Sequence, residues 1–507
     1  MHPSTQSQWR ERHTIVLISA LLLGLSLRLA ASTTRPIWYD EAFAILFSEK
    51  GIQDMLAGTL TPVNGVSADV HPLAYYTLLW GWMRLFGESL LAVRALSILF
   101  GMGVILLVYL LAKSVGLPKV AIPATILTAI SPFQIHYAQE IRMYALLALL
   151  LMLASWALWQ GVHNGCWYWW GIFACSSALA QYTHNLAFFY LLPLALTSVL
   201  YRHWRYLLYT LLSGSLAGLF YLPWLLHLPG QFARVQSDYW TSRPGFDRVV
   251  TTLLSFTTNL PLPEAWLPGA LFVAIFCCMI AGRQTLRAYR LRLPGYQAGL
   301  WFLYLAIVPA SLLFLFSQWR PVYIERALIA SGVMYLLWLA WALVETDLAI
   351  PIQRVTAVLL ILAFGTGYYQ HLTYRGFPYA PYPQMMQALE TRLIPGDVIL
   401  HSNKLTMLPS VFYARQLPQE YLDDPPGSGA DTLAEPTQKT LGLYARPSVE
   451  DAVGEAQRVW FVIFTRAIEE YHQQGYASHP HLEWLQEHYQ LQGVETWDDV
   501  RLYQFIR

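Results

Sequence analysis

Long apolar runs separated by short polar loops fill the first 370 positions of the chain. A helix needs about 17 to 25 mostly apolar residues to cross a bilayer, and most of these runs approach that length. The pattern predicts about eleven membrane-spanning helices, at residues 14–31, 92–112, 120–135, 143–160, 166–182, 186–201, 206–227, 267–282, 297–317, 326–345 and 353–370.

The pattern changes after residue 371. PQMMQALETRL has the spacing of an amphipathic helix, IPGDVIL and VWFVIF have the apolar content of buried strands, and HLEWLQEHYQ and VRLYQFI predict a further helix and a final alternating strand. The stretch 417–450 is dense in Pro, Gly, Asp and Thr, which favours a loop. We therefore predict a transmembrane domain over 1–370 and a small α/β domain over 371–507.

The composition agrees with a polytopic α-helical membrane protein. Only 12% of the residues are charged and 56% are hydrophobic, whereas a soluble chain carries roughly 25% charged residues. The formal net charge is +1 and the sequence has no basic stripe, which excludes nucleic acid as a partner. All four cysteines fall within apolar runs, so we expect small core residues and no disulfide framework or zinc site.

The distribution of Lys and Arg predicts the orientation in the membrane. If the N-terminus is cytoplasmic, the cytoplasmic loops are the basic ones; they hold Lys113, Lys119, Arg202, Arg205, Arg283, Arg287, Arg290, Arg292 and Arg354. We expect an integral protein of the plasma (inner) membrane, with loops 32–91, 133–142, 228–266 and 318–325 and the C-terminal domain on the extracytoplasmic side.

The segment between residues 70 and 87, HPLAYYTLLWGWMRLFG, leaves two alternatives open. It is apolar enough to cross the bilayer, which would reverse all later loops. Its Trp and Tyr residues favour a helix that lies along the outer interface, and we expect that arrangement.

Two polar clusters in the predicted outer loops are candidates for chemistry. Asp40 and Glu41 follow the first span in RPIWYDEAF and could form a general base, a metal ligand or a solvated loop. The turn SPFQIHYAQEIRMYALL concentrates Gln139, Glu140, Arg142 and Tyr144. A carboxylate, a guanidinium and phenols suit a sugar phosphate, although Glu140 and Arg142 could instead form an interfacial ion pair.

Three further outer features add binding candidates. His71 precedes Tyr75 and Tyr76 by about one helical turn, and all three can lie near one site. The QYTHN turn supplies Tyr182 and His184, and QWRPVYIER supplies Arg326. A lone His or Arg at the end of a span is more often an interface anchor. The hypothesis of a binding site therefore depends on the placement of all these residues on the same, outer side of the membrane.

The order of these motifs resembles a known family. WYDEAF, then HPLAYYTLLWGWMRLFGESLLAVRALS, then SPFQIHYAQEIRMYALL is similar to the GT-C integral-membrane glycosyltransferases of the protein O-mannosyltransferase type (glycosyltransferase family 39-like), which include the bacterial aminoarabinose transferases of lipid A. The resemblance implies a GT-C fold and a polyprenyl-phosphate-linked sugar donor. It implies that the acid of the first outer loop is Asp40, with Glu41 beside it.

The resemblance also covers the later motifs, with two departures. The second-loop acid matches Glu140 and the following base matches Arg142. The family's His-Pro-Pro-Leu-Tyr-Tyr pattern appears from His71 to Tyr76 without its second proline and leucine. An Arg-Tyr pair appears as Arg326 followed by Ala327, which makes phosphate binding by Arg326 less certain.

These observations predict an inverting displacement. Asp40 would take the proton of the acceptor, while Arg142, His71 and Arg326 stabilise the leaving phosphate. Glu41 and Glu140 would orient sugar hydroxyls, or Asp40 and Glu140 would hold a divalent cation; no cofactor is certain and no dedicated metal spacing is present.

The expected partners are the polyprenyl-phosphate sugar, membrane lipid and an acceptor that is a lipid, a glycan or a protein. The alternatives are a transporter or flippase, or an assembly protein, for lipid-linked glycans. Transporters place charge at the bilayer midplane, whereas here it gathers in loops. Within the enzyme class, a phosphotransferase or ligase is the runner-up.

Overall fold

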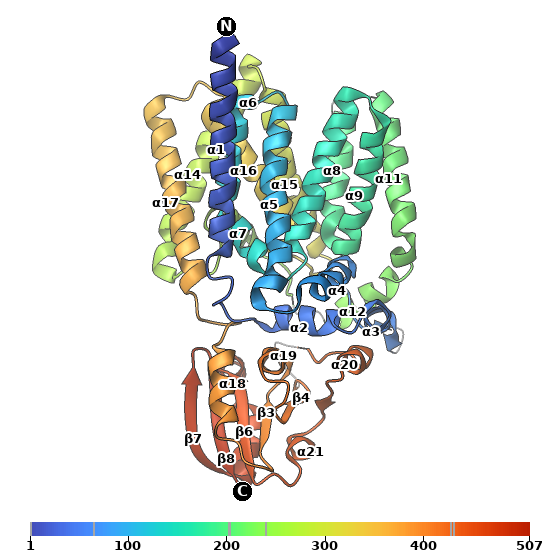
Figure 1. Cartoon of the computed structure of the whole chain (residues 1–507), viewed down its shortest axis with the longest axis vertical. Coiled ribbons are helices and arrows are strands. Elements are labelled where there is room, and N and C mark those ends of the chain that lie inside the picture. Colours follow the sequence, from blue (N-terminus) through green and yellow to red (C-terminus); the bar gives the residue numbers. More distant parts are fainter. Residues whose placement is uncertain (1–2, 64–65, 201–203, 239–240, 426–427, 429–430) are drawn as a thin grey trace.

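The computed structural model describes residues 3–507 except 64–65, 201–203, 239–240, 426–427 and 429–430. It consists of a helical bundle with an α/β domain packed against one end (Figure 1). Helix α1 begins at the opposite end of the bundle and runs toward the α/β domain (Figure 1).

Eleven helices of the bundle coincide with the eleven predicted spans. They are α1 (Pro3–Leu29), α5 (Leu90–Ser114), α6 (Pro118–Ile130), α8 (Tyr144–Asn164), α9 (Trp167–Thr183), α10 (Phe188–Leu200), α11 (Trp204–Leu225), α14 (Leu267–Leu291), α15 (Tyr296–Ser317), α16 (Ile329–Val344) and α17 (Ile350–Thr373). Among the described residues, seven helices are long and apolar enough to cross a membrane, and shorter apolar stretches lie in α1, α6 and α10. The chain is an integral membrane protein, as predicted. Arg202, one of the basic loop residues, lies outside the described residues.

Helix α16 forms the centre of the bundle. Its sequence, IASGVMYLLWLAWALV, is apolar on every side, and a helix of that kind is buried all round. It packs against α6, α8, α14 and α15. The four cysteines form no disulfide.

Shorter elements cover the end of the bundle that faces the α/β domain (Figure 1). They are α2 (Tyr39–Ser48), α3 (Ile52–Leu60), α4 (Ala74–Phe86), α7 (Pro132–Gln139), α12 (Leu228–Asp238), α13 (Phe246–Thr258), the 3-10 turns η1 (Asn185–Ala187), η2 (Glu264–Trp266) and η3 (Glu325–Leu328), and the two-stranded pair β1 (Pro62–Val63) and β2 (Val66–Ser67). The 13 residues of α4 are too few to cross a bilayer. Helix α4 begins at Ala74, so His71 precedes the helix and does not open it.

Two predicted loops are helical. The predicted loop 133–142 contains most of helix α7, which starts at Pro132. The span predicted at 120–135 is therefore wrong at its end, because α6 stops at Ile130. A proline has no amide hydrogen and pushes the preceding residue out of the helical conformation; Ser131 is accordingly extended, with φ −62° and ψ 120°. Asp40 and Glu41 lie in the first turn of α2, where negative charge favours a helix N-terminus.

The C-terminal domain contains a six-stranded sheet in the order β5-β4-β3-β6-β8-β7. Its strands are β3 (Val398–His401), β4 (Gln419–Leu422), β5 (Ala445–Arg446), β6 (Arg458–Phe464), β7 (Gln490–Trp497) and β8 (Val500–Ile506). Strands β5, β4, β3 and β6 are parallel to one another, whereas β8 is antiparallel to both β6 and β7. The helices are α18 (Tyr382–Glu390), α19 (Lys404–Tyr413), α20 (Glu435–Leu441), α21 (Val449–Val453), α22 (Thr465–Gln473) and α23 (Pro480–His488).

The central strands β3 and β6 bury both faces, which explains their nearly continuous apolar sequences. The prediction that 417–450 is one loop is wrong, because β4, α20 and β5 lie within it. Strand β4 has only four residues and starts with the half-buried polar Gln419 and Glu420, so no apolar alternation marks it. Residues 426–427 and 429–430 of this stretch lie outside the described residues.

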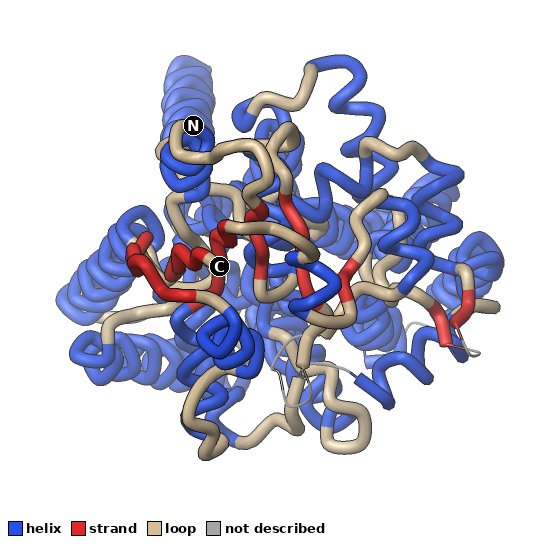
Figure 2. Tube along the Cα trace, turned by 90° about the horizontal axis from the view of Figure 1, so that it is seen from below, coloured by secondary structure: helices blue, strands red, loops and turns tan. Residues whose placement is uncertain are grey.

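Helix α2 is held between the bundle and the α/β domain. Helix α19 packs on α2, and α20 packs on α3, where the Thr437 hydroxyl donates to the Gly58 carbonyl at 2.8 Å. The backbone amide of Ile37 donates to the Tyr413 hydroxyl at 3.0 Å, and Arg415 forms an ion pair with Glu49. Seen from the side of the α/β domain, the strands lie over the central part of the bundle (Figure 2). The first turn of α2 therefore lies at the junction of the two domains.

Candidate functional site

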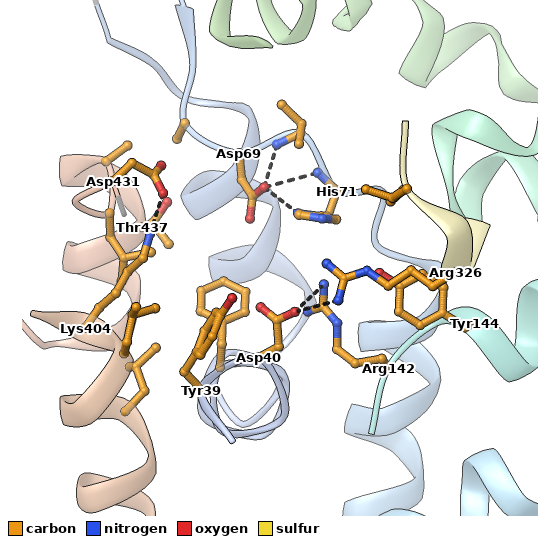
Figure 3. Close-up of a pocket in the computed structure, with 18 of the residues that line it drawn as sticks. Tyr39, Asp40, Asp69, His71, Arg142, Tyr144, Arg326, Lys404, Asp431 and Thr437 are labelled. Carbon is orange, nitrogen blue, oxygen red and sulfur yellow. Dashed lines mark hydrogen bonds and ion pairs between the residues drawn. The ribbon is translucent and has the colours of Figure 1, made fainter. Parts of the chain in front are cut away.

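A cavity of about 290 Å³ lies at this junction. Both domains contribute to its wall, as Figure 3 shows. The lining polar side chains from the bundle are Tyr39, Asp40, Asp69, His71, Arg142, Tyr144 and Arg326, and those from the α/β domain are Lys404, Asp431, Thr437 and Arg466.

Asp40 contacts two guanidinium groups in the cavity, and both lie on the same side of its carboxylate (Figure 3). Its Oδ2 is 3.6 Å from Nη2 of Arg142 and 3.9 Å from Nη1 of Arg326. Arg142 is 3% exposed and also donates to the Tyr76 hydroxyl at 3.0 Å. Burial alone would lower the pKa of Arg142, but the charge of Asp40 raises this pKa well above its usual value. These three side chains carry a net charge of +1, which matches a single phosphodiester anion.

His71 and Asp69 form a second polar pair in the same cavity. The Nδ1 atom of His71 lies 2.8 Å from Oδ1 of Asp69, which also accepts hydrogen bonds from the backbone amides of Val70 and His71. Burial would raise the pKa of Asp69, yet the charge and hydrogen bond of His71 and the two amides lower it to about 2. Asp69 therefore remains a carboxylate that fixes the His71 ring at the cavity wall.

A second cavity of about 250 Å³ shares Tyr39, Arg326 and Phe377 with the first. Burial, followed by the charge of Asp40, raises the pKa of Tyr39, so its phenol keeps its proton. Cations and histidines also line this second cavity, including Arg35, His136 and His371.

Glu140 faces the second cavity. Its Oε1 is 3.1 Å from Nε2 of His136, and its buried Oε2 has no hydrogen-bond partner among the described residues. Burial would raise the pKa of Glu140, but His136 lowers it. The alternative of a Glu140–Arg142 ion pair is wrong, because each residue has another partner.

Glu41 lines neither cavity. Its carboxylate forms an ion pair with Arg94 of α5 at 3.1 Å, with both side chains 2% exposed. Its Oε1 also accepts a hydrogen bond from the backbone amide of Ile141 at 3.1 Å. Glu41 thus connects α2, α5 and the segment that carries Glu140 and Arg142.

Five other predicted residues, Gln139, Tyr75, Tyr76, Tyr182 and His184, lie outside both cavities, and Tyr76 is the residue that accepts the hydrogen bond from Arg142. Gln139 ties α7 to the end of α1 by donating to the Arg28 and Ala30 carbonyls, at 2.9 and 2.7 Å. The hydroxyl of Tyr75 lies 2.8 Å from that of Ser97, and Tyr182 donates to the Phe220 carbonyl.

His184 is the last of these residues. Its Nδ1 accepts a hydrogen bond from the backbone amide of Leu186 at 3.1 Å, and its ring lies 6.0 Å from that of Tyr144. Burial, followed by the positive charges of His71, Arg326 and Arg142, lowers its pKa well below the usual value. His184 is therefore neutral and supports the cavity wall from behind Tyr144.

Sequence reasoning did not select several lining residues. Asp69 lies two positions before His71 and could have been found from that spacing. Lys404, Asp431 and Arg466 belong to the α/β domain, and only its packing against the bundle brings them to the cavity.

The described residues provide no ligand set for a divalent cation at Asp40 and Glu140. No three His, Cys, Asp or Glu side chains converge there as a metal site. Asp40 already contacts two guanidinium groups, whose charge opposes a cation, and Glu140 faces the other cavity. We derive no chemical step through a metal.

Comparison with known proteins identifies the fold. Residues 70–227 match the model of the family described as dolichyl-phosphate-mannose-protein mannosyltransferase. No curated protein matches the chain.

Solved structures match nearly the whole chain. The apo structure of ArnT from Cupriavidus metallidurans superposes with a TM-score of 0.65 at 13% identity, covering 97% of this chain and 98% of that one. The same protein bound to undecaprenyl phosphate gives a TM-score of 0.60 at 12% identity, with 96% and 97% covered. The apo oligosaccharyltransferase of Archaeoglobus fulgidus gives 0.51 at 13%, with 94% and 73% covered. The predicted resemblance to GT-C glycosyltransferases is confirmed at the level of the fold.

Proposed function

We propose that this GT-C-fold membrane protein is a glycosyltransferase that moves a sugar from a polyprenyl-phosphate-linked donor to an acceptor. The observation that carries the proposal is the Asp40 carboxylate paired with both Arg142 and Arg326 in a cavity at the bundle end. The family model over residues 70–227 and the superposed structure with bound undecaprenyl phosphate support a donor of this class.

The two guanidinium groups bind the donor phosphate. Both groups contact the Asp40 carboxylate, and a phosphodiester oxygen offers them a second anionic partner. Because the three side chains carry a net +1, the phosphodiester neutralises the site, and the extra charge that develops as the phosphate leaves is stabilised by donors already in place. When both of its ring nitrogens carry a proton, His71, held by Asp69 through Nδ1, supplies a further donor through Nε2.

Asp40 acts as the general base. The acceptor hydroxyl or amine gives its proton to Asp40 while its heteroatom bonds to the anomeric carbon. The bond between that carbon and the phosphate oxygen breaks in the same displacement, and the phosphate leaves with both electrons. Attack opposite the leaving group inverts the anomeric centre, whereas a glycosyl-carboxylate intermediate would retain it.

Glu140 and Glu41 have separate roles in this proposal. Glu140 lines the second cavity together with Arg326, and its Oε2, which has no hydrogen-bond partner among the described residues, can accept a hydrogen bond from a sugar hydroxyl once a small movement of the side chain exposes it. Glu41 keeps Asp40 and Arg142 in position through Arg94 and the Ile141 amide. Tyr39, shared by both cavities, lies where the reacting sugar would pass.

The proposed location is the extracytoplasmic face of the plasma (inner) membrane. Lys and Arg predict a cytoplasmic N-terminus, and α1 begins at the bundle end opposite the α/β domain (Figure 1). The reaction site and the α/β domain then share the outer side, where a polyprenyl tail can remain in the bilayer while its phosphate reaches Arg142.

The test is release of free undecaprenyl phosphate by the purified chain from a panel of undecaprenyl-phosphate hexoses and pentoses, with lipid, peptide and glycoside acceptors. Release that requires an acceptor, and a product of inverted anomeric configuration, support the proposal. Binding of a donor without release under any condition would instead favour a flippase or an assembly protein. Retention of the anomeric configuration would exclude the single-displacement mechanism.

The phosphate site has its own control. Arg142→Met and Arg326→Met should each weaken undecaprenyl phosphate binding about tenfold or more, since each removes a charge-assisted hydrogen bond. Arg446→Met removes an arginine of an exposed ion pair on β5 that lines neither cavity, and should leave binding unchanged.

A further inference from the structure

The sheet of the C-terminal domain has a topological switch point that opens onto the cavity. The chain passes from β3 to β4 and β5 on one side and returns to β6 on the other side of β3. In open α/β sheets, ligands bind in the crevice at the carboxyl ends of the two strands that flank this point. Lys404 follows β3 and Arg466 follows β6, and both line the cavity that contains Asp40.

We infer that this crevice is the acceptor subsite and that it recognises a neutral carbohydrate. The inference rests on the proposed function and names the acceptor class of the same reaction. It assigns the Lys404–Asp431 pair as the element that selects the acceptor, at the wall of the cavity that faces Asp40 (Figure 3).

The charge of this wall argues for a neutral ligand. Nζ of Lys404 lies 2.8 Å from Oδ1 of Asp431, and Nε of Arg466 lies 2.7 Å from Oε1 of Glu470. Each cation already has a carboxylate partner, so an anion would have to displace one. In the opposite wall, the two arginines and Asp40 together carry the net +1 that suits the donor phosphate.

The chemistry of the ion pair suits vicinal hydroxyls. A hydroxyl both donates and accepts, an ammonium donates three hydrogen bonds, and a carboxylate only accepts. The pair therefore offers adjacent donor and acceptor positions to one diol. The Lys404 side chain is 12% exposed and that of Asp431 is 40% exposed, so the ammonium is held while the carboxylate remains accessible.

Apolar side chains complete the subsite. Leu405, Leu408 and Leu433 line the cavity beside the pair and can pack against the C–H face of a sugar ring. Helix α19 carries Lys404 and also packs on α2, which carries Asp40. A sugar held by the pair thus lies across the cavity from the proposed base, with its position fixed by direct contact between the two helices.

The test uses the full chain in detergent with four probes: methyl α-D-mannopyranoside, methyl β-D-glucopyranoside, glycerol phosphate and N-acetylserine amide. Saturation-transfer NMR measures their binding to the wild type, to Lys404→Met, to Asp431→Asn and to the control Arg446→Met. We expect a glycoside to bind the wild type and the control, and to bind both pair variants about tenfold more weakly, since each variant loses a charge-assisted hydrogen bond.

Three results would overturn the inference. They are glycoside binding that is unchanged in both pair variants, wild-type binding of glycerol phosphate or the serine amide in preference to the glycosides, and no glycoside binding at all. Undecaprenyl phosphate binding, measured on the same samples, confirms that each variant is folded. If undecaprenyl phosphate does not bind while a glycoside binds through the pair, the proposed donor fails and the carbohydrate subsite stands.

Discussion

The buried pair of Glu41 and Arg94 gives the sharpest prediction about how the site is held. Both side chains are 2% exposed. Arg94 donates to the carbonyls of Ser32 and Arg35, both at 2.9 Å, and Glu41 accepts from the Ile141 amide. The pair therefore fixes the segment before α2, α2 itself and the segment that carries Arg142.

The magnitude follows from burial. Glu41→Gln keeps the shape and the hydrogen bond from Ile141 but leaves the Arg94 charge unpaired in a buried site, which should cost about 3 to 5 kcal/mol of unfolding free energy. Arg94→Met should cost a similar amount, because it strands the carboxylate and two carbonyls. The double variant removes both charges, so its loss should fall short of the sum by about 2 to 3 kcal/mol.

The assay is equilibrium unfolding in mixed micelles for the wild type and the three variants, with sugar transfer measured in parallel. In Glu41→Gln we expect both the unfolding free energy and the rate of sugar transfer to fall. The rate falls because a small displacement of Asp40 and Arg142 is enough to slow the reaction. A Glu41→Gln protein that unfolds like the wild type but cannot transfer sugar would refute this reasoning and assign Glu41 to the chemistry. Purely additive losses would show that the pair is not coupled.

Three further predictions follow from other parts of the fold. Gly367→Ala places a Cβ 1.6 Å from the Thr258 carbonyl oxygen and should destabilise the contact between α17 and α13 by about 1 to 3 kcal/mol or more. Gly365→Ala on the same helix meets nothing within 4 Å and should be neutral or slightly stabilising in the same unfolding assay, because alanine favours a helix over glycine. Burial lowers the pKa of His401 to about 3, so only the unfolded chain takes up a proton at this residue as pH falls below about 6.5. The contribution of His401 to the unfolding free energy is complete above that pH and is lost by roughly 1.4 kcal/mol per pH unit below it. His401→Gln should therefore show a shallower decrease of stability with falling pH in thermal melts. Arg142→Lys should weaken undecaprenyl phosphate binding although it keeps the charge. A lysine ammonium lacks the planar guanidinium that contacts both Asp40 and the Tyr76 hydroxyl. Equal binding by the lysine variant would argue against a geometric role of Arg142.

The spanning helices could be predicted from the sequence because the bilayer imposes their length and polarity. The failures lie at the end of the bundle, where polar residues are buried through long-range partners. Glu41 pairs with Arg94, 53 positions later, and Gln139 caps the end of α1, about 110 positions earlier. No local pattern separates such buried groups from a solvated loop, so α2 and α7 were expected to be loops.

Part of the candidate site could be predicted from the sequence. Asp40, His71, Arg142, Tyr144 and Arg326 share the cavity because the topology brings their loops to one end of the bundle. The wall formed by the α/β domain could not be predicted, because the position of Lys404 depends on strand order and on the packing of α19 against α2.

The most direct test of the central claim compares Asp40→Asn with Asp54→Asn, a matched change on the exposed face of the neighbouring helix α3. Both variants are measured for single-turnover sugar transfer from the undecaprenyl-phosphate sugar that the wild type uses, and for affinity toward undecaprenyl phosphate. The account predicts that Asp40→Asn transfers about 10² to 10⁴ times more slowly, as expected for loss of a general base, yet binds undecaprenyl phosphate at least as tightly, because Arg142 and Arg326 lose a competing carboxylate. Transfer by Asp40→Asn at the rate of Asp54→Asn and the wild type would contradict it.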